Sequence, residues 1–172
     1  MNESEISQEF NRQACFLLRQ SLKKIEHCLR QIDFDQCWWR PRPGLSSIGN
    51  LLLHVNGNLR QWAISGLTGT SDKRNRDAEF ESDRERSIDD LLELTRNTIN
   101  EACFVIEKVQ PQDLIAPINI QGFEVTWLQA IVHTTAHYQG HTHQIIMLTR
   151  MQLGDDYQFE WTPDLPRGEL PM

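Results

Sequence analysis

Residues 133–144 read HTTAHYQGHTHQ, and this short stretch holds four of the six histidines of the chain. His133, His137 and His141 follow one another at steps of four residues. An α-helix advances about 100° per residue, so a step of four returns to nearly the same face. His137 and His141 are therefore expected to point toward one neighbour, at a spacing that lets two imidazoles reach one metal ion. His133 lies a turn earlier and His143 is expected to face away, so the pair needs a third ligand from elsewhere.

Two histidines lie outside that stretch, His27 and His54. His27 stands among charged residues, as expected of a position that faces solvent. His54 lies in LLLHVNGNLRQW (residues 51–62), at the centre of a predicted helix and at the edge of its apolar face. A lone histidine in such a place is more often a core-edge residue bonded to a polar neighbour. The HxxxH pair on a separate helix favours the alternative, in which His54 is the third ligand.

Four long stretches have the apolar spacing of amphipathic helices. Their expected bounds are 5–32, 46 or 47–67, 87–108 and 126–153. The charged segment 68–86 is expected to be a solvated loop, and INIQGFEV (118–125) is compatible with a short hairpin. The sequence therefore predicts an all-α protein: a single domain, residues 1–172, folded as an up-down four-helix bundle. An irregular C-terminal tail with Trp161 is expected to pack across its surface.

The composition narrows the class of partner. The 172 residues carry a net charge of -7, which argues against nucleic acid or an anionic membrane surface. No apolar run is long enough to span a bilayer. The first residues, MNESEISQEF, lack the basic and apolar regions of a signal peptide, and the four cysteines form no CxxC pair. These features favour a cytoplasmic protein with a small-molecule substrate.

The segments SIGNLLLHVNGNLRQW (47–62) and HYQGHTHQI (137–145) resemble the DinB/YfiT-like superfamily of four-helix bundles with a three-histidine metal site. The RNRDAEFE segment (74–81) and the WTPD tail also resemble one subgroup of uncharacterised members. The resemblance implies that His54 matches the histidine of the family's first helix pair and that His137 and His141 match its paired histidines. At His143 many relatives have glycine. Known members include thiol S-transferases and a thiol-dependent isomerase that use bacillithiol, mycothiol or glutathione.

Three neutral imidazoles would leave a divalent transition metal with its full charge and an open coordination position. Zinc or nickel is the expected ion, although imidazole also suits copper and iron. Such an ion makes hydroxide or thiolate available near neutral pH. Gln144 falls on the ligand face and could hydrogen-bond a ligand or the metal-bound molecule. His133 and Tyr138 flank the site and either line its pocket or pack in the bundle.

Three functions follow from this site. The first is a metal-dependent enzyme that activates a low-molecular-weight thiol for transfer to an electrophilic substrate. The alternatives are a metal-dependent hydrolase using metal-bound hydroxide and a non-catalytic protein that binds metal or a small molecule. No glutamate adjoins the HxxxH pair as a general base, so thiol transfer ranks first. A homodimer is also expected, because the chain has more tryptophans than a small bundle core needs and dimers are common among the relatives it resembles.

Overall fold

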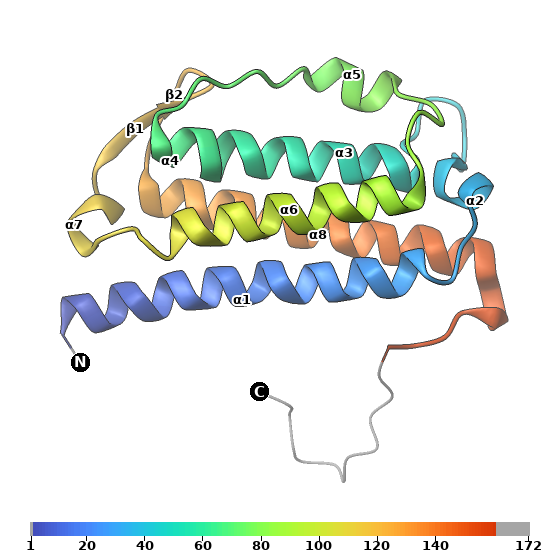
Figure 1. Cartoon of the computed structure of the whole chain (residues 1–172), viewed down its shortest axis with the longest axis horizontal. Coiled ribbons are helices and arrows are strands. Elements are labelled where there is room, and N and C mark those ends of the chain that lie inside the picture. The colour runs from blue at the N-terminus through green and yellow to red at the C-terminus, as the bar shows by residue number, and fades with distance from the viewer. Residues whose placement is uncertain (1, 161–172) are drawn as a thin grey trace, which may run out of the picture.

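Four long helices lie side by side in the computed structural model, which describes residues 2–160 (Figure 1). These helices are α1 (Glu3–Leu29), α3 (Ile48–Leu59), α6 (Ile88–Ile106) and α8 (Trp127–Leu153). Helices α1 and α3 each contact both α6 and α8, so the four helices surround one core. The predicted all-α fold is confirmed, with one two-stranded sheet in the described part of the chain.

Helices α3, α6 and α8 each begin directly after an N-capping residue. Ser47, Ser87 and Thr126 each accept a hydrogen bond from a backbone amide of the first turn, in three capping boxes that satisfy otherwise unpaired N–H groups. Three helix starts predicted from the sequence are therefore confirmed. Helix α1 ends before the predicted residue 32, and the short α2 (Phe34–Trp38) follows it.

The second predicted helix is interrupted by a wider turn. After α3 the chain continues as a π-helical turn, η1 (Arg60–Ser65), and then as the short α4 (Gly66–Thr68). A Cβ atom added at Gly66 would lie 2.8 Å from Cδ1 of Ile120. The glycine therefore lets the end of this helix approach the strand that carries Ile120.

The connection between α3 and α6 crosses back along the whole length of the bundle (Figure 1). As a result α3 and α6 run in the same direction, and the four directions do not alternate strictly. A connection this long permits such a crossover. The expectation of a solvated loop is confirmed for most of the connection, which is largely exposed, but residues 76–81 form α5 (Arg76–Glu81), which packs on α3 and buries Glu79.

The predicted hairpin is present before α8. Following α7 (Pro111–Leu114), strands β1 (Pro117–Ile120) and β2 (Phe123–Thr126) pair antiparallel, with Ile120 opposite Phe123. The two residues between them, Gln121 and Gly122, have φ angles of 55° and 83°, as two-residue hairpin turns require. The hairpin covers the end of the bundle at which α8 begins (Figure 1).

The core combines aliphatic side chains with a small polar layer. Completely buried aliphatic residues come from each long helix: Leu18, Ile25, Leu52, Leu59, Leu91, Ile99, Ile131 and Ile145. Among them Asn56 donates to Thr95 at 2.9 Å and accepts from the hydroxyl of Tyr138 at 3.2 Å, so the amide of Asn56 is paired on both sides. None of the helices in residues 2–160 has both the length and the apolar character that a membrane crossing requires.

The chain continues past α8 with a short 3-10 turn, η2 (Gly154–Asp156). The predicted course of the tail with Trp161 lies outside the described residues. All four cysteines are buried free thiols, in agreement with the absence of a cysteine motif.

Candidate metal centre

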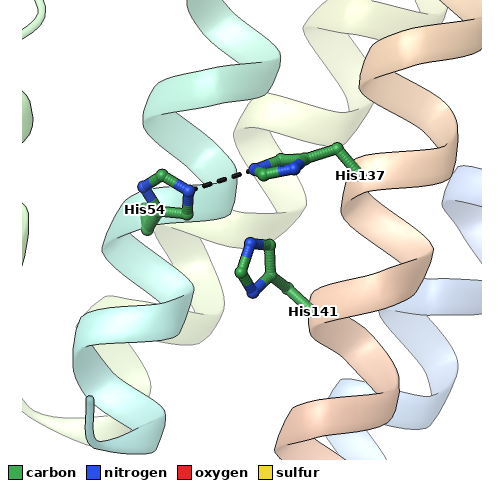
Figure 2. Close-up of side chains that lie close together, drawn as sticks. All are labelled: His54, His137 and His141. Carbon is green, nitrogen blue, oxygen red and sulfur yellow. Dashed lines mark hydrogen bonds between the residues drawn. The ribbon is translucent and has the colours of Figure 1, made fainter. Parts of the chain in front are cut away.

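Three histidines from two helices meet between α3 and α8 (Figure 2). His54 comes from the middle of α3, and His137 and His141 come from successive turns of α8. One ring nitrogen from each residue lies within 4.8 Å of the others, and the Nε2 atoms of His54 and His137 are 3.0 Å apart. The group could therefore hold one metal ion, and it consists of the three residues that the sequence singled out.

Two of the three rings are oriented by a neighbour on the side away from the cluster. His54 Nδ1 lies 3.0 Å from Glu79 Oε2, and His141 Nδ1 lies 2.7 Å from Gln144 Oε1. When Nδ1 donates to these oxygens, the lone pair of the neutral imidazole is on Nε2. In both rings Nε2, which points away from the acceptor, is therefore the nitrogen that can bind an ion. Metal-binding histidines in proteins are oriented in this way.

Glu79 is held by Arg74 as well as by His54. Arg74 Nε donates to Oε1 at 2.7 Å and Nη2 donates to Oε2 at 2.8 Å, and both side chains are about nine-tenths buried. Arg74 Nη2 also lies 3.1 Å from His54 Nδ1. Because an ionised carboxylate can only accept, its 3.0 Å contact with His54 Nδ1 assigns the proton of this ring to Nδ1.

The charge of Glu79 follows from these contacts. Burial alone would raise the pKa of its carboxyl group, but the hydrogen bonds from Arg74 and His54 together outweigh burial and lower that pKa. Glu79 is therefore ionised, and Arg74 balances its charge. The Arg74–Glu79 pair therefore adds no net charge beside the three histidines.

The Arg74–Glu79 pair approaches α3 at Gly57. A Cβ atom at this position would overlap Glu79 Oε1 and lie 3.0 Å from Arg74 Nε. Asn50 Nδ2 fixes the other end of α5 by donating to the carbonyl oxygens of Glu79 at 3.0 Å and Ser82 at 2.8 Å. This support was not predicted from the sequence. The one sequence feature that could have indicated it is the pair Arg74 and Glu79, five residues apart. Glu79 precedes Phe80, an apolar residue in an otherwise charged segment.

The two cluster histidines of α8, His137 and His141, are neutral at neutral pH. Burial, followed by the charges of His141 and His54, lowers the pKa of His137 to about 4. Burial also lowers the pKa of His141, and the hydrogen bond to Gln144 opposes this shift only in part. A metal ion needs the unprotonated imidazole, so the environment of the cluster fits the binding of a cation.

The remaining histidines lie outside the cluster. His133 stacks on His137 with ring centroids 5.8 Å apart and also packs on Trp62. His143 is exposed and donates to the carbonyl oxygen of Gln139 at 2.9 Å, away from the site. His27 is partly buried and its Nε2 lies 2.5 Å from the carbonyl oxygen of Gln158, so it is less exposed than expected.

Tyr138 is a core residue. Its side chain is 1% exposed, and its hydroxyl donates to Asn56 on α3. Of the two flanking residues considered from the sequence, His133 lines the pocket beside the cluster and Tyr138 does not.

A pocket of about 600 Å³ opens beside the cluster. Its walls come from α3, η1, the segment before α5, the hairpin and α8, and they include His54, Asn58, Trp62, Arg76, Phe123 and His133. This volume is typical of sites for small molecules. His54 and His137 both line the pocket, so a molecule inside it reaches the edge of the cluster.

Comparisons with known proteins agree with this fold. A DinB-like protein from Bacillus subtilis is 16% identical and has a TM-score of 0.64, over 86% of this chain and 96% of that one. A DinB-like protein from Bacillus cereus ATCC 10987 is 14% identical and has a TM-score of 0.62, over 77% of this chain and 85% of that one. At these identities the likeness shows a DinB-like fold.

No curated protein matches the sequence. The model of one protein family, described as a protein of unknown function (DUF1572), matches residues 5–168, which include every helix of the bundle except the first two residues of α1. The chain therefore belongs to the DUF1572 family and has the fold of DinB-like proteins.

Proposed function

We propose that the chain is a metal-dependent enzyme that binds a low-molecular-weight thiol and transfers its sulfur to an electrophilic carbon. The observation that carries this proposal is the cluster of three histidines at the edge of the small-molecule pocket. His54, His137 and His141 would hold a divalent ion, with zinc and nickel as the first candidates. When bound, the ion would lower the pKa of a coordinating thiol so that it reacts as the thiolate.

The transfer is balanced without a redox partner. The thiol loses its proton, and a sulfur electron pair forms the new S–C bond. The bond from that carbon to the leaving group breaks, and the leaving group departs with the bonding electrons. The step needs a position for the thiol and a group that accepts its proton.

The acidic and basic groups near the cluster leave one candidate for the proton acceptor. Glu79 is ionised, but His54 and Arg74 occupy both of its oxygens on the side away from the pocket, which leaves it poorly placed as a general base. His133 lines the pocket, and the described residues offer its ring nitrogens no hydrogen-bond partner. It is the group best placed to take the proton that the thiol releases.

The position of His133 also supports a second candidate, a metal-dependent hydrolase. An imidazole free to accept a proton could assist the attack of water on an ester or amide. This reaction needs no thiol, so the two candidates differ in a property that is simple to measure. A protein that only binds metal or a small molecule would perform neither reaction.

The test uses the purified protein loaded with zinc or nickel and a panel of electrophiles, with and without a small thiol. Thiol transfer predicts a conjugation rate that requires both the metal and the thiol and that His137→Ala abolishes. His143→Ala is the matched control, because this exposed histidine on the same helix lies outside the cluster. Turnover of esters without thiol would favour the hydrolase, and no turnover with either substrate set would contradict both enzymes.

A further inference from the structure

The pocket beside the histidine cluster contains a buried amide with an unused donor. Asn58 lies one turn after His54 on α3 and is 6% exposed. Its Oδ1 accepts a hydrogen bond from the hydroxyl of Thr134 at 3.1 Å. The described residues provide no acceptor for its Nδ2, yet this atom is not sealed from the pocket. Asn58 therefore presents an N–H donor, and no free acceptor, to a molecule in the pocket.

Such a donor indicates a ligand with a complementary atom. Buried polar groups in proteins are nearly always hydrogen-bonded, and those without a protein partner need an explanation. Thr134 donates to the Oδ1 atom in this structure, so Nδ2 is the amide atom that remains for a ligand. The complementary group is therefore a carbonyl or carboxylate oxygen.

A positive charge on the same pocket favours the carboxylate. Arg76 is exposed at the start of α5, and no ion pair joins it to a carboxylate in the described part of the chain. Its guanidinium lies over the ring of Phe80, which in turn packs against His54 with ring centroids 4.8 Å apart. Arg74, in contrast, is already neutralised by Glu79.

The other walls suit the carbon skeleton of such a ligand. Trp62 and Phe123 provide apolar surface between the polar groups. The acidic residue on the lining, Glu124, is exposed on β2, so a carboxylate is favoured on the side of α3 and α5.

We propose that this pocket binds the carboxylate of a small-molecule substrate, with Asn58 Nδ2 as the buried donor and Arg76 as the cation. The other end of the molecule then reaches the edge of the histidine cluster. In its simplest form this inference rests on the proposed function: the substrate is a thiol that also carries a carboxylate. Asn58 and Arg76 would then determine which thiols the protein accepts.

The experiment compares β-mercaptopropionate with its neutral amide, β-mercaptopropionamide. Protein loaded with cobalt(II) is titrated with each thiol, and the sulfur-to-cobalt absorption band reports binding. The wild-type protein is expected to bind the acid on the order of tenfold more tightly than the amide, as a charge-assisted hydrogen bond provides. Propionate and propionamide are titrated into metal-free protein by calorimetry as a pair without a thiol.

Two variants test the Asn58 donor and the Arg76 charge separately. Asn58→Asp keeps the oxygen that Thr134 bonds but replaces the donor with an acceptor, so the preference for the acid should disappear. Asn119→Asp is its control, because exposed Asn119 also uses Oδ1 as an acceptor, from Gly122, and lies outside the pocket. Arg76→Gln should reduce the preference, whereas Arg86→Gln, which removes an exposed arginine outside the pocket, should not.

The outcomes separate the two proposals. Equal affinity for acid and amide, or an undiminished preference in Asn58→Asp, would overturn the carboxylate subsite while leaving thiol binding intact. If neither thiol changes the cobalt spectrum, the proposed function fails. The calorimetric pair then decides the subsite alone: propionate binding that depends on Asn58 supports it, and the absence of such binding overturns it.

Discussion

Nδ1 of His54 lies 3.0 Å from the carboxylate of Glu79, although 25 residues separate the two in the sequence. The contact joins the centre of α3 to the segment that crosses the bundle, and Arg74 completes it from the other side of the carboxylate. The orientation of one candidate ligand is therefore determined by a part of the chain that supplies no ligand itself.

Glu79→Gln should weaken metal binding. The amide can still accept a hydrogen bond from His54, but it no longer carries the negative charge, and Arg74 loses its ion-pair partner. Loss of such a partner typically lowers metal affinity by about 10- to 100-fold. Competition with a chromophoric chelator measures the affinity. Glu81→Gln is the control, because Glu81 ends the same helix and is exposed. Equal affinities in the two variants would show that Glu79 does not support the site.

Gly57→Ala should disturb the same contact without changing a charged residue. The added methyl group would overlap the Glu79 carboxylate, so the Arg74–Glu79 pair must move away from α3. Both metal affinity and the stability of the metal-free protein are expected to fall. Gly140→Ala provides the opposite case, because this exposed glycine of α8 has open space around it and alanine favours the helix by about 0.5–1 kcal/mol. Urea unfolding of the two variants should shift in opposite directions.

Substitution of each candidate ligand by alanine should remove the metal. His54→Ala, His137→Ala and His141→Ala each leave two imidazoles, which is too few for a stable site. Elemental analysis after purification without a chelator provides the measurement. His27→Ala and His143→Ala should keep the wild-type metal content, since both residues lie outside the cluster. Full metal content in all three ligand variants would refute the assignment.

Bound metal should stabilise the fold, because it would join α3 to α8. A ligand present at 100 times its dissociation constant contributes about 2.7 kcal/mol. For a chain of this length that corresponds to a rise in Tm of roughly 5–10 °C. Thermal unfolding followed by circular dichroism, with zinc or with a chelator, tests this expectation. The same addition should leave the Tm of His137→Ala almost unchanged, and a similar rise in that variant would place the ion elsewhere.

The protein is also predicted to form a homodimer. Trp38 and Trp62 are buried in the core, which weakens the argument from tryptophan content, whereas Trp39 is 38% exposed. Exposed apolar side chains on α1 and α8, among them Phe16 and Val132, offer a further apolar surface. Light scattering at micromolar concentration should give twice the mass of one chain. The mass of a single chain would contradict the prediction.

The elements predicted correctly are those whose signal is local. Ser47, Ser87 and Thr126 are followed three residues later by a polar partner, and this pattern alone places three helix starts. The cluster follows from helical spacing, because the step between His137 and His141 is one turn. That this cluster binds a metal ion is still a prediction.

The features that the sequence analysis missed depend on distant contacts. Arg74 and Glu79 are buried only because α5 packs on α3 at Gly57. A short charged segment has no apolar periodicity from which such packing could be predicted. The direction of α6 likewise depends on the path of the long connection, which charge and composition do not specify.

The π-helical turn η1 has a consequence for the shape of the pocket. A π-helical turn holds about one residue more than an α-helical turn, so the side chains that follow it are rotated by about 100° from their places in an uninterrupted α-helix. Gly66 comes directly after this turn and meets Ile120 of the hairpin, whose second strand forms a wall of the pocket. The extra residue of η1 thus determines the position of the hairpin relative to the helix. Relatives that lack this insertion would present a differently shaped entrance to the same three histidines.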